Sequence, residues 1–294
     1  MPVNCWSIHT RLSVKALFLG ALCLWLVASC TPTSQMHSIC KQCTSFTLAS
    51  AISPLQVWAR NLPMNERGQP IAAAPSLHIY LENDGAAFLS PTRIAANPSL
   101  RAQLLALHLM QVDLNPSIYI TRPCYGFAFD ALPASCTPRY WTQARYSPEV
   151  VQALSQAIDH AKQKLNQTNT PLVLIGHSGG GSLALLIAHT RQDVQKVITL
   201  AANLDTDSWT ELHGYSPLTQ SLNPFNQPLL PANIERWHFA GGQDRTVPPE
   251  LMNPTCTRDK AAHCLLVPSA THTEGWLEQW PSLLKTTHEH SNSL

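Results

Sequence analysis

A serine stands among glycines near the middle of the chain, in the string Gly176-His177-Ser178-Gly179-Gly180. The apolar run PLVLIG precedes it with strand character, and the apolar run SLALLIAH follows with helix character. The string matches G-x-S-x-G, in which a tight strand-to-helix turn strains the serine backbone and leaves no room for Cβ atoms beside it. The hydroxyl then lies at a helix N-terminus, where free N–H groups favour negative charge. This pattern predicts a nucleophilic serine.

The elements that must position this serine alternate between strands and helices. LHIYLEND, SIYITRP, VQKVITLA, IERWHFAG and HCLLVP are strand candidates, after the shorter SFTLAS and LQVWAR. Helix starts are indicated by Asn97 before Pro98 and by Ser147 before Pro148, and the string SATHTEGWLEQW begins as a loop and becomes a last helix. The alternation predicts an α/β fold with a mostly parallel, doubly wound sheet and helices on both faces.

Composition fits a globular chain with a large core. Of the 294 residues, 45% are hydrophobic and 13% charged, which excludes a disordered chain. Of the 19 basic residues only Arg11 and Lys15, and none of the 18 acidic ones, lie in the first 29 positions, which leaves 17 basic against 18 acidic residues. A nearly neutral body gives no reason to expect a nucleic acid partner.

The first 29 residues have the pattern of a targeting segment. Arg11 and Lys15 precede the uncharged run ALFLGALCLWLVAS, which is short for a membrane span but typical of a signal peptide. The end of this run, LVASC, resembles a bacterial lipobox, which implies cleavage before Cys30 and lipid attachment to it. The alternatives are an ordinary secretory signal with an incidental cysteine and a retained membrane anchor. We expect a lipid-anchored protein of the bacterial cell envelope, on the periplasmic side of the outer membrane.

Cysteine usage agrees with export. Six cysteines remain after Cys30, an even number that suggests three disulfides. We favour the pairs close in sequence, Cys124 with Cys136 and Cys256 with Cys264. The other two, Cys40 and Cys43, form a C-x-x-C motif without the flanking strand and helix that a redox site needs.

Several strings give the chain a resemblance to the α/β-hydrolases over nearly all of its mature length. More narrowly, it resembles a poorly characterised group of bacterial lipoprotein α/β-hydrolases. The strings that carry this resemblance are YLENDG, TRPCY, YWTQARYSPEVV, GHSGGG, NLDTDSWTELHGYSPLTQSLNP and GGQDRTVPP. We expect a signal peptide at 1–29, a tether at 30–45, an α/β-hydrolase domain at 46–286 and a flexible tail at 287–294.

The resemblance implies partners for Ser178 in the chain order serine, acid, histidine. Asp244 follows the strand candidate RWHFA, where the fold places the acid, and Asp205 after the preceding strand is the alternative. His272 lies after the last strand and is the expected base. His177 is expected to point elsewhere and to shape the pocket.

Other charged and histidine residues receive no catalytic assignment. Asp207 and Asp259 are expected at the surface. His263 precedes the last strand, His238 lies within a strand, and the histidines of the tail, 288 and 290, form only a weak metal pair.

An oxyanion site is implied as well. One donor is expected to be the backbone N–H of Gly179, and the other that of Asp84, with Asn83 as the alternative. Related sequences tend to read E-G-D-G where this chain reads Glu82-Asn83-Asp84-Gly85, and Asn tolerates the left-handed backbone that such a turn uses. No metal or other cofactor is expected.

Function at this stage is a prediction with alternatives. A carboxylester hydrolase acting through an acyl-enzyme on a small or lipid acyl ester leads, although a thioesterase, peptidase or acyltransferase uses the same triad. A non-catalytic envelope lipoprotein is the alternative of another class. The 33 residues 201–233 predict a short lid. Arg122 and Arg145 either bind an acidic group or form loop salt bridges. Five aromatic residues either line an acyl pocket or pack loops, namely Trp209, Tyr215, Phe225, Tyr140 and Trp141.

Overall fold

The computed structural model describes residues 32–72, 74–101 and 104–289. Eight strands of this part form one sheet, with bounds β1 (Thr44–Leu48), β2 (Leu55–Arg60), β3 (Leu77–Leu81), β6 (Ser117–Ile120), β7 (Leu172–His177), β8 (Val194–Leu200), β9 (Glu235–Gly241) and β10 (Ala262–Val267). The described helices are α1 (Pro32–Ile39), α2 (Leu105–Val112), α3 (Pro148–Lys164), α4 (Gly179–Ala188), α5 (Thr206–His213), α6 (Asn253–Arg258) and α7 (Trp280–Glu289). A small hairpin pairs β4 (Phe88–Ser90) with β5 (Arg93–Ile94).

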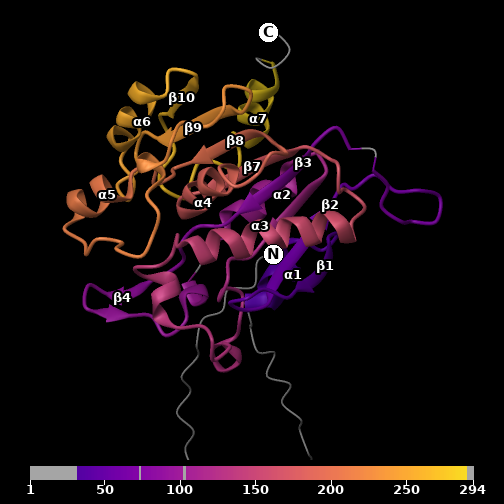
Figure 1. The fold of residues 1–294 in the computed structure, drawn as a ribbon, viewed down its shortest axis with the longest axis horizontal. Helices are drawn as coiled ribbons and strands as arrows, with labels where there is room; N and C mark the ends of the chain where they lie inside the picture. The colour runs from indigo at the N-terminus through magenta and orange to yellow at the C-terminus, as the bar shows by residue number, and fades with distance from the viewer. Residues whose placement is uncertain (1–31, 73, 102–103, 290–294) are drawn as a thin grey trace, which may run out of the picture. The chain divides into compact units, whose positions relative to one another are not determined.

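The sheet is mostly parallel, as the alternation predicts. Its order is β1-β2-β6-β3-β7-β8-β9-β10, and all neighbours from β6 to β10 pair in parallel (Figure 1). β2 is antiparallel to β6, and β1 is antiparallel to β2. The chain passes from β3 to β6 on one side and later enters β7 on the other, so strand order reverses between β3 and β7. The carboxyl ends of strands at such a point form the crevice in which open α/β sheets bind ligands.

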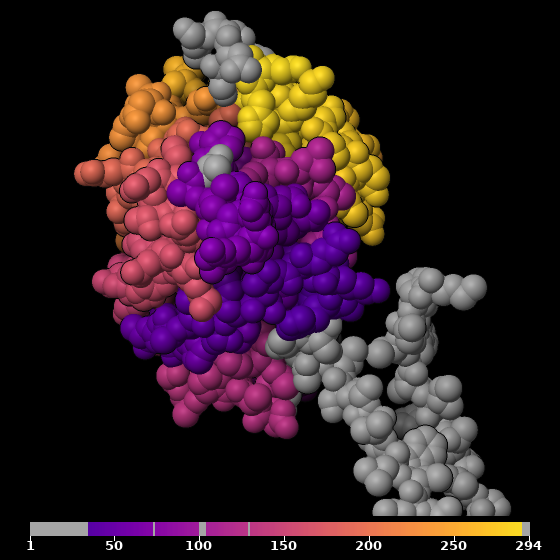
Figure 2. All heavy atoms as spheres, turned by 90° about the vertical axis from the view of Figure 1, so that its right-hand side faces the viewer, coloured from indigo at the N-terminus to yellow at the C-terminus, as the bar shows by residue number. Residues whose placement is uncertain are grey.

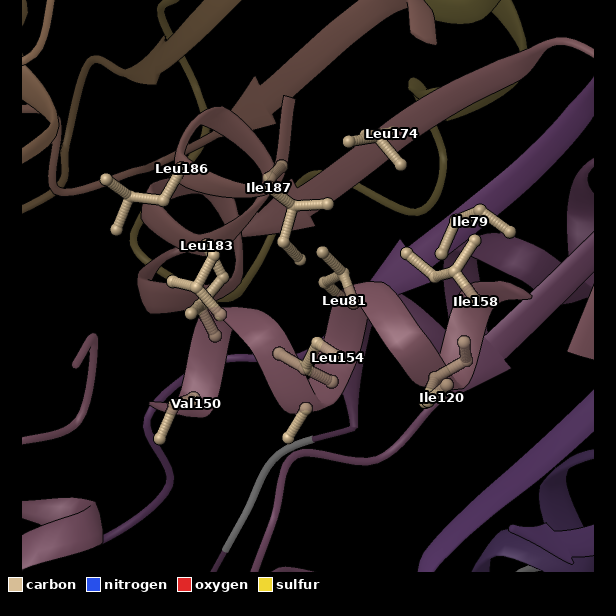
Figure 3. Close-up of a cluster of buried hydrophobic side chains, with 14 of the residues drawn as sticks. Ile79, Leu81, Ile120, Val150, Leu154, Ile158, Leu174, Leu183, Leu186 and Ile187 are labelled. Atoms are coloured by element: carbon tan, nitrogen blue, oxygen red, sulfur yellow. The ribbon is translucent and has the colours of Figure 1, made fainter. Parts of the chain in front are cut away.

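One face of the sheet packs against α3 and α4. Leu77, Ile79 and Leu81 of β3 point to this face because side chains alternate along a strand, and they meet apolar residues of both helices. Figure 3 shows this cluster, with Ile79 and Leu81 beside Ile158 of α3 and Ile187 of α4. The α3 start is as predicted: the Ser147 side chain accepts a hydrogen bond from the Val150 N–H.

The opposite face packs against α1, α2 and α7. Tyr80 of β3 points there, and its hydroxyl accepts a hydrogen bond from Trp280 Nε1 of α7 at 3.1 Å. Figure 2 views the side at which β1 lies and shows the indigo N-terminal residues at the surface, with yellow C-terminal residues beside them. Both faces are therefore covered, which explains why β3, β6 and β7 are buried at every position.

Two expected boundaries differ from the structure. Within the expected tether, α1 is helical and packs on the domain, with Met36 and Cys40 buried. In the expected tail, α7 continues to Glu289 and Thr287 is buried. Both segments are mostly polar, but their buried residues pack against the domain and hold the segment in place. Cys30 and residues 1–29 and 290–294 lie outside the described residues.

The helix expected from Asn97 begins later than its start signal. Asn97 does accept a hydrogen bond from the Ser99 N–H at 2.9 Å, but it opens a 3₁₀ turn over Pro98–Arg101. The α-helix α2 starts at Leu105. The start signal was therefore correct for a helical turn and wrong for the helix that follows.

Three disulfides join the six cysteines of the described residues. Cys124 pairs with Cys136 and Cys256 with Cys264, which confirms the two favoured pairs. Cys40 pairs with Cys43 at the end of α1. No described helix is long and apolar enough to span a membrane.

Candidate active site

Ser178 occupies the turn between β7 and α4, with φ 54° and ψ −123°. This strained backbone is possible because its neighbours lack side chains: a methyl group on Gly176 would collide with the Gly180 carbonyl, and one on Gly180 would collide with the Leu81 carbonyl. The Ser178 N–H donates to the Leu200 carbonyl at 2.9 Å, which ties the turn to β8. The serine is thus held at the carboxyl edge of the sheet.

Ser178, His272 and Asp244 lie in one hydrogen-bonded row. His272 Nε2 lies 3.0 Å from Ser178 Oγ, and His272 Nδ1 lies 2.8 Å from Asp244 Oδ2. Ser178 follows β7, Asp244 follows β9 and His272 follows β10, so the carboxyl ends of three parallel strands bring the row to one edge of the sheet. A nucleophile, a base and a group that orients the base have this arrangement in hydrolases that use an acyl-enzyme.

The Asp244 carboxylate is fixed on both of its oxygens. Its second oxygen, Oδ1, accepts hydrogen bonds from the N–H groups of Thr246 at 2.7 Å and Val247 at 2.8 Å. The side chain is fully buried, whereas 18% of the His272 side chain is exposed. The carboxylate is therefore held toward the ring, and the ring keeps a solvent-facing edge.

The alternative acid, Asp205, has a different environment. Its carboxylate caps the N-terminus of α5 by accepting from the N–H groups of Asp207 and Ser208, and it also accepts from Asn223 Nδ2 at 2.7 Å. Burial raises the pKa of this carboxyl, but the Ser208, Asn223 and backbone donors outweigh it and lower the pKa. Asp205 serves as a helix cap in this structure.

Three further histidines have contacts outside the row of Ser178, His272 and Asp244. His238 in β9 is within 2.8 Å of Thr199 Oγ1, and burial lowers its pKa to about 4. His263 stacks on Trp237 at the start of β10, and His288 stacks on His78. Asp259, expected at the surface, is instead buried and paired with Arg236.

His177 is a site residue that the sequence argument misplaced. Its ring is fully buried, and its Nε2–H donates to the backbone carbonyl of His272 at 2.7 Å. Its Nδ1 lies 3.8 Å from Glu82 Oε1. His177 therefore holds the loop that carries the base. The adjacency of His177 to the serine was the available signal, but its partner lies 95 residues away.

The second proposed oxyanion residue, Asp84, lies against Gly179. A methyl group on Gly179 would collide with the Asp84 carboxylate. Asn83 closes the turn by accepting from the Gly85 N–H at 2.7 Å, so the change from E-G-D-G is accommodated. Gly179 and Asp84, whose backbone N–H groups are the expected oxyanion donors, thus lie against each other. Their role as oxyanion donors stays a prediction.

Arg122 and Arg145 form salt bridges rather than a free acid-binding site. Both pair with the Asp84 carboxylate. The described residues contain no group of three acidic, histidine or cysteine side chains suited to a metal ion.

The aromatic residues divide between packing and site-adjacent positions. Trp141 is buried and donates to the Ala95 carbonyl, and Tyr140 lies against Arg139. Phe225 lines a cavity beside the end of α4 that does not include Ser178, Asp244 or His272. Trp209 of α5 donates to the Thr246 carbonyl, in the acid loop, and Tyr215 packs on Trp209. Of the five, Trp209 is thus tied to the loop that carries Asp244.

Comparisons with known proteins agree with this fold. Residues 142–261 match the family described as serine aminopeptidase, S33. No curated protein sequence is significantly similar to the chain. The mostly parallel sheet and the similarity to solved structures show that the chain has the α/β-hydrolase fold.

Solved structures share the fold at low sequence identity. A lidless α/β serine hydrolase of Xanthomonas campestris is 15% identical, with a TM-score of 0.50 over 82% of this chain and 94% of that one. A Pyrococcus furiosus esterase is 11% identical, with a TM-score of 0.54 over 84% and 91%. The acylaminoacyl peptidase of Pyrococcus horikoshii is 12% identical, with a TM-score of 0.54 over 83% of this chain but only 41% of that one.

Proposed function

We propose that the protein is a serine hydrolase that cleaves carboxylic esters through an acyl-enzyme on Ser178. The observation that carries the proposal is the hydrogen-bonded row from Asp244 through His272 to Ser178. The fold shared with the Pyrococcus furiosus esterase and the serine hydrolase of Xanthomonas campestris supports it.

The mechanism follows from the positions of the three side chains. His272 Nε2 takes the Ser178 proton as Oγ attacks the ester carbonyl carbon, and the buried Asp244 carboxylate stabilises the resulting imidazolium. The negative charge on the carbonyl oxygen is stabilised by the backbone N–H groups of Gly179 and Asp84. His272 then gives its proton to the leaving alcohol, and water repeats the sequence on the acyl-enzyme.

Amide hydrolysis is the second candidate. The matched family is described as an aminopeptidase, and one structural neighbour is an acylaminoacyl peptidase. The same row of side chains would serve an amide, because the proton on His272 can pass to an amine. A thioester or a second acyl acceptor would be handled in the same way. A non-catalytic role gives no reason for a strained serine in hydrogen-bond contact with a histidine.

A labelling and activity experiment tests the proposal. The wild-type protein is expected to react with a fluorophosphonate probe and to hydrolyse short p-nitrophenyl esters faster than the matching amides. Ser178→Ala should lose the label and at least about 10⁴-fold in turnover while melting at the wild-type temperature. Hydrolysis by the purified variant at the wild-type rate would reject the mechanism, and faster cleavage of amides would favour the peptidase.

We further propose that the chain is exported and lipid-anchored through Cys30. The lipobox-like LVASC string and the three disulfides of the described residues support this. Mass spectrometry of the mature N-terminus should find a lipid on Cys30. A chain that retains unmodified Met1 would contradict the proposal.

A further inference from the structure

We propose that Arg122, Arg145 and Tyr146 are positioning residues for the oxyanion site, which they serve by fixing the peptide whose N–H belongs to Asp84. The inference rests on the proposed function, because it concerns the second oxyanion donor. It also accounts for three of the sequence strings, YLENDG, TRPCY and YWTQARYSPEVV, that the row of Ser178, His272 and Asp244 leaves unexplained.

The side chain of Asp84 is held by three donors from two other segments. Arg122 Nη1 donates to Oδ1, whereas Arg145 Nη1 at 3.3 Å and the Tyr146 hydroxyl donate to Oδ2. Arg122 follows β6, and the other two donors precede α3. Residues far apart in the chain thus donate to one carboxylate, and together they fix the orientation of the Asp84 side chain.

The backbone on both sides of the Asp84 N–H is fixed as well. Arg122 Nη1 donates to the Asn83 carbonyl at 3.4 Å, and the Tyr125 hydroxyl donates to the Asp84 carbonyl at 2.7 Å. The Asn83 carbonyl and the Asp84 N–H belong to one planar trans peptide, in which C=O and N–H point in opposite directions. By holding the carbonyl, Arg122 turns the Asp84 N–H away from itself. This is how a guanidinium can aim a donor that it does not touch.

The arginines are themselves braced. Arg122 Nη2 donates to the Arg145 carbonyl at 2.8 Å, and Arg145 Nε donates to the Thr142 carbonyl at 2.8 Å. The Arg122 side chain is 1% exposed and the Arg145 side chain 7% exposed. The group therefore forms one rigid unit, the Asp84 cluster, which consists of Asp84, Arg122, Arg145 and Tyr146.

The charge of the Asp84 cluster suits an oxyanion. Burial raises the pKa of the Asp84 carboxyl, but the charges of Arg122 and Arg145 and the Tyr146 hydroxyl outweigh it and lower the pKa to about 2. One carboxylate against two guanidinium groups leaves one positive charge in excess. The carboxylate lies against Gly179 at the N-terminus of α4, and its two arginines neutralise the negative charge that would otherwise oppose an oxyanion there.

Conservative variants of the full chain test the inference. Tyr146→Phe removes one hydroxyl, and Arg145→Lys keeps the charge but loses the fork geometry. The matched control is Arg236→Lys, because Arg236 forms a buried pair with Asp259 where β9 begins, at the opposite edge of the sheet from Asp244. For each protein we would measure kcat and KM on a p-nitrophenyl ester, the Ki of an alkyl trifluoromethyl ketone, and the melting temperature.

The expected result is specific to an oxyanion role. Both cluster variants should lose about 10- to 100-fold in kcat with KM changed less than about threefold, and the ketone Ki should rise in proportion to the loss in kcat/KM. Arg236→Lys should keep the wild-type kcat and Ki whatever its melting temperature. The inference is overturned if folded cluster variants keep the wild-type kcat, if kcat falls without a change in Ki, or if the control behaves like them.

Failure of the proposed function would look different. A wild-type protein that neither reacts with fluorophosphonate nor turns over any ester or amide removes the proposed function itself. An active wild type whose cluster variants are equally active removes only the positioning role.

Discussion

Two groups of buried charges hold this fold together at opposite edges of the sheet, and they are built differently. Where β9 begins, Arg236 donates to both oxygens of Asp259 at 2.9 and 3.0 Å, one positive charge against one negative. At the carboxyl edge, the Asp84 cluster sets two arginines against one aspartate. In the first group, the remaining guanidinium nitrogen bonds to carbonyls of the Pro231 and Ile234 segment just before its own strand. In the second, Arg122 also donates to the carbonyls of Asn83 and Arg145, which belong to two other loops.

The different ratios of arginine to aspartate suggest different roles for the two groups. A balanced buried pair can close a segment onto a strand, and it needs no further explanation than chain packing. A buried excess of charge costs stability, so a cluster that retains one is better explained by the site it adjoins. Three measurements test whether the two groups differ in their effects on stability and on kcat.

The largest effect is expected from removing one arginine from each group. Arg236→Met should lower the free energy of unfolding by about 3–5 kcal/mol, because Asp259 is left buried without its partner. Arg122→Met should lower it by less, because Arg145 still pairs with Asp84. Urea unfolding measures this loss. The fraction of Arg122→Met that remains folded should have a reduced kcat, whereas folded Arg236→Met should not. Equal kcat values for the two variants would mean that the groups do not differ in function.

A smaller effect is expected from acid. The pKa of Asp84 is lowered in the folded chain from 3.8 to about 2, so its contribution to stability is complete above about pH 4 and is lost as pH falls towards 2. A shift of this size corresponds to about 2 kcal/mol. Unfolding free energies of the wild type should therefore fall more steeply over this range than those of Asp84→Asn. Parallel curves would show that the carboxylate gains little from its two arginines.

The smallest effect is expected at a surface pair that belongs to neither group. Arg139 lies 3.5 Å from Glu149, and more than a third of each side chain is exposed. Arg139→Ala should change the free energy of unfolding by less than about 1 kcal/mol, since solvent screens such pairs, and should leave kcat unchanged. A loss comparable to that of Arg236→Met would show that exposure is a poor guide to the strength of ion pairs in this chain.

Much of the fold could be predicted because its signals are local. The run before Gly176, the helix after it and the Ser147 cap are each read within about ten residues, and the strand alternation follows from them. The prediction of a tether at 30–45 missed the helix α1 for the opposite reason. Its residues look polar in sequence, and α1 is stabilised by Met36 and Cys40 against a distant part of the chain.

The site residues show the same distinction between local signals and contacts with distant residues. Ser178, Asp244 and His272 could be named because each follows a strand whose end meets the same edge. The positions of His177 and of Arg122 could not be derived, because the first depends on a carbonyl 95 residues away and the second on a carboxylate 38 residues away. From the sequence, Arg122 and Arg145 could either bind an acidic group or form loop salt bridges, and only the positions of the loops decide between the two.

The docking of α1 has a consequence for reach. Thr31 alone separates Cys30 from the start of α1 at Pro32, a span of less than about 10 Å even when fully extended. If Cys30 carries the proposed lipid, this short linker would hold the folded domain close to the membrane surface. If the proposed esterase function also holds, the enzyme would act on esters at or near that surface.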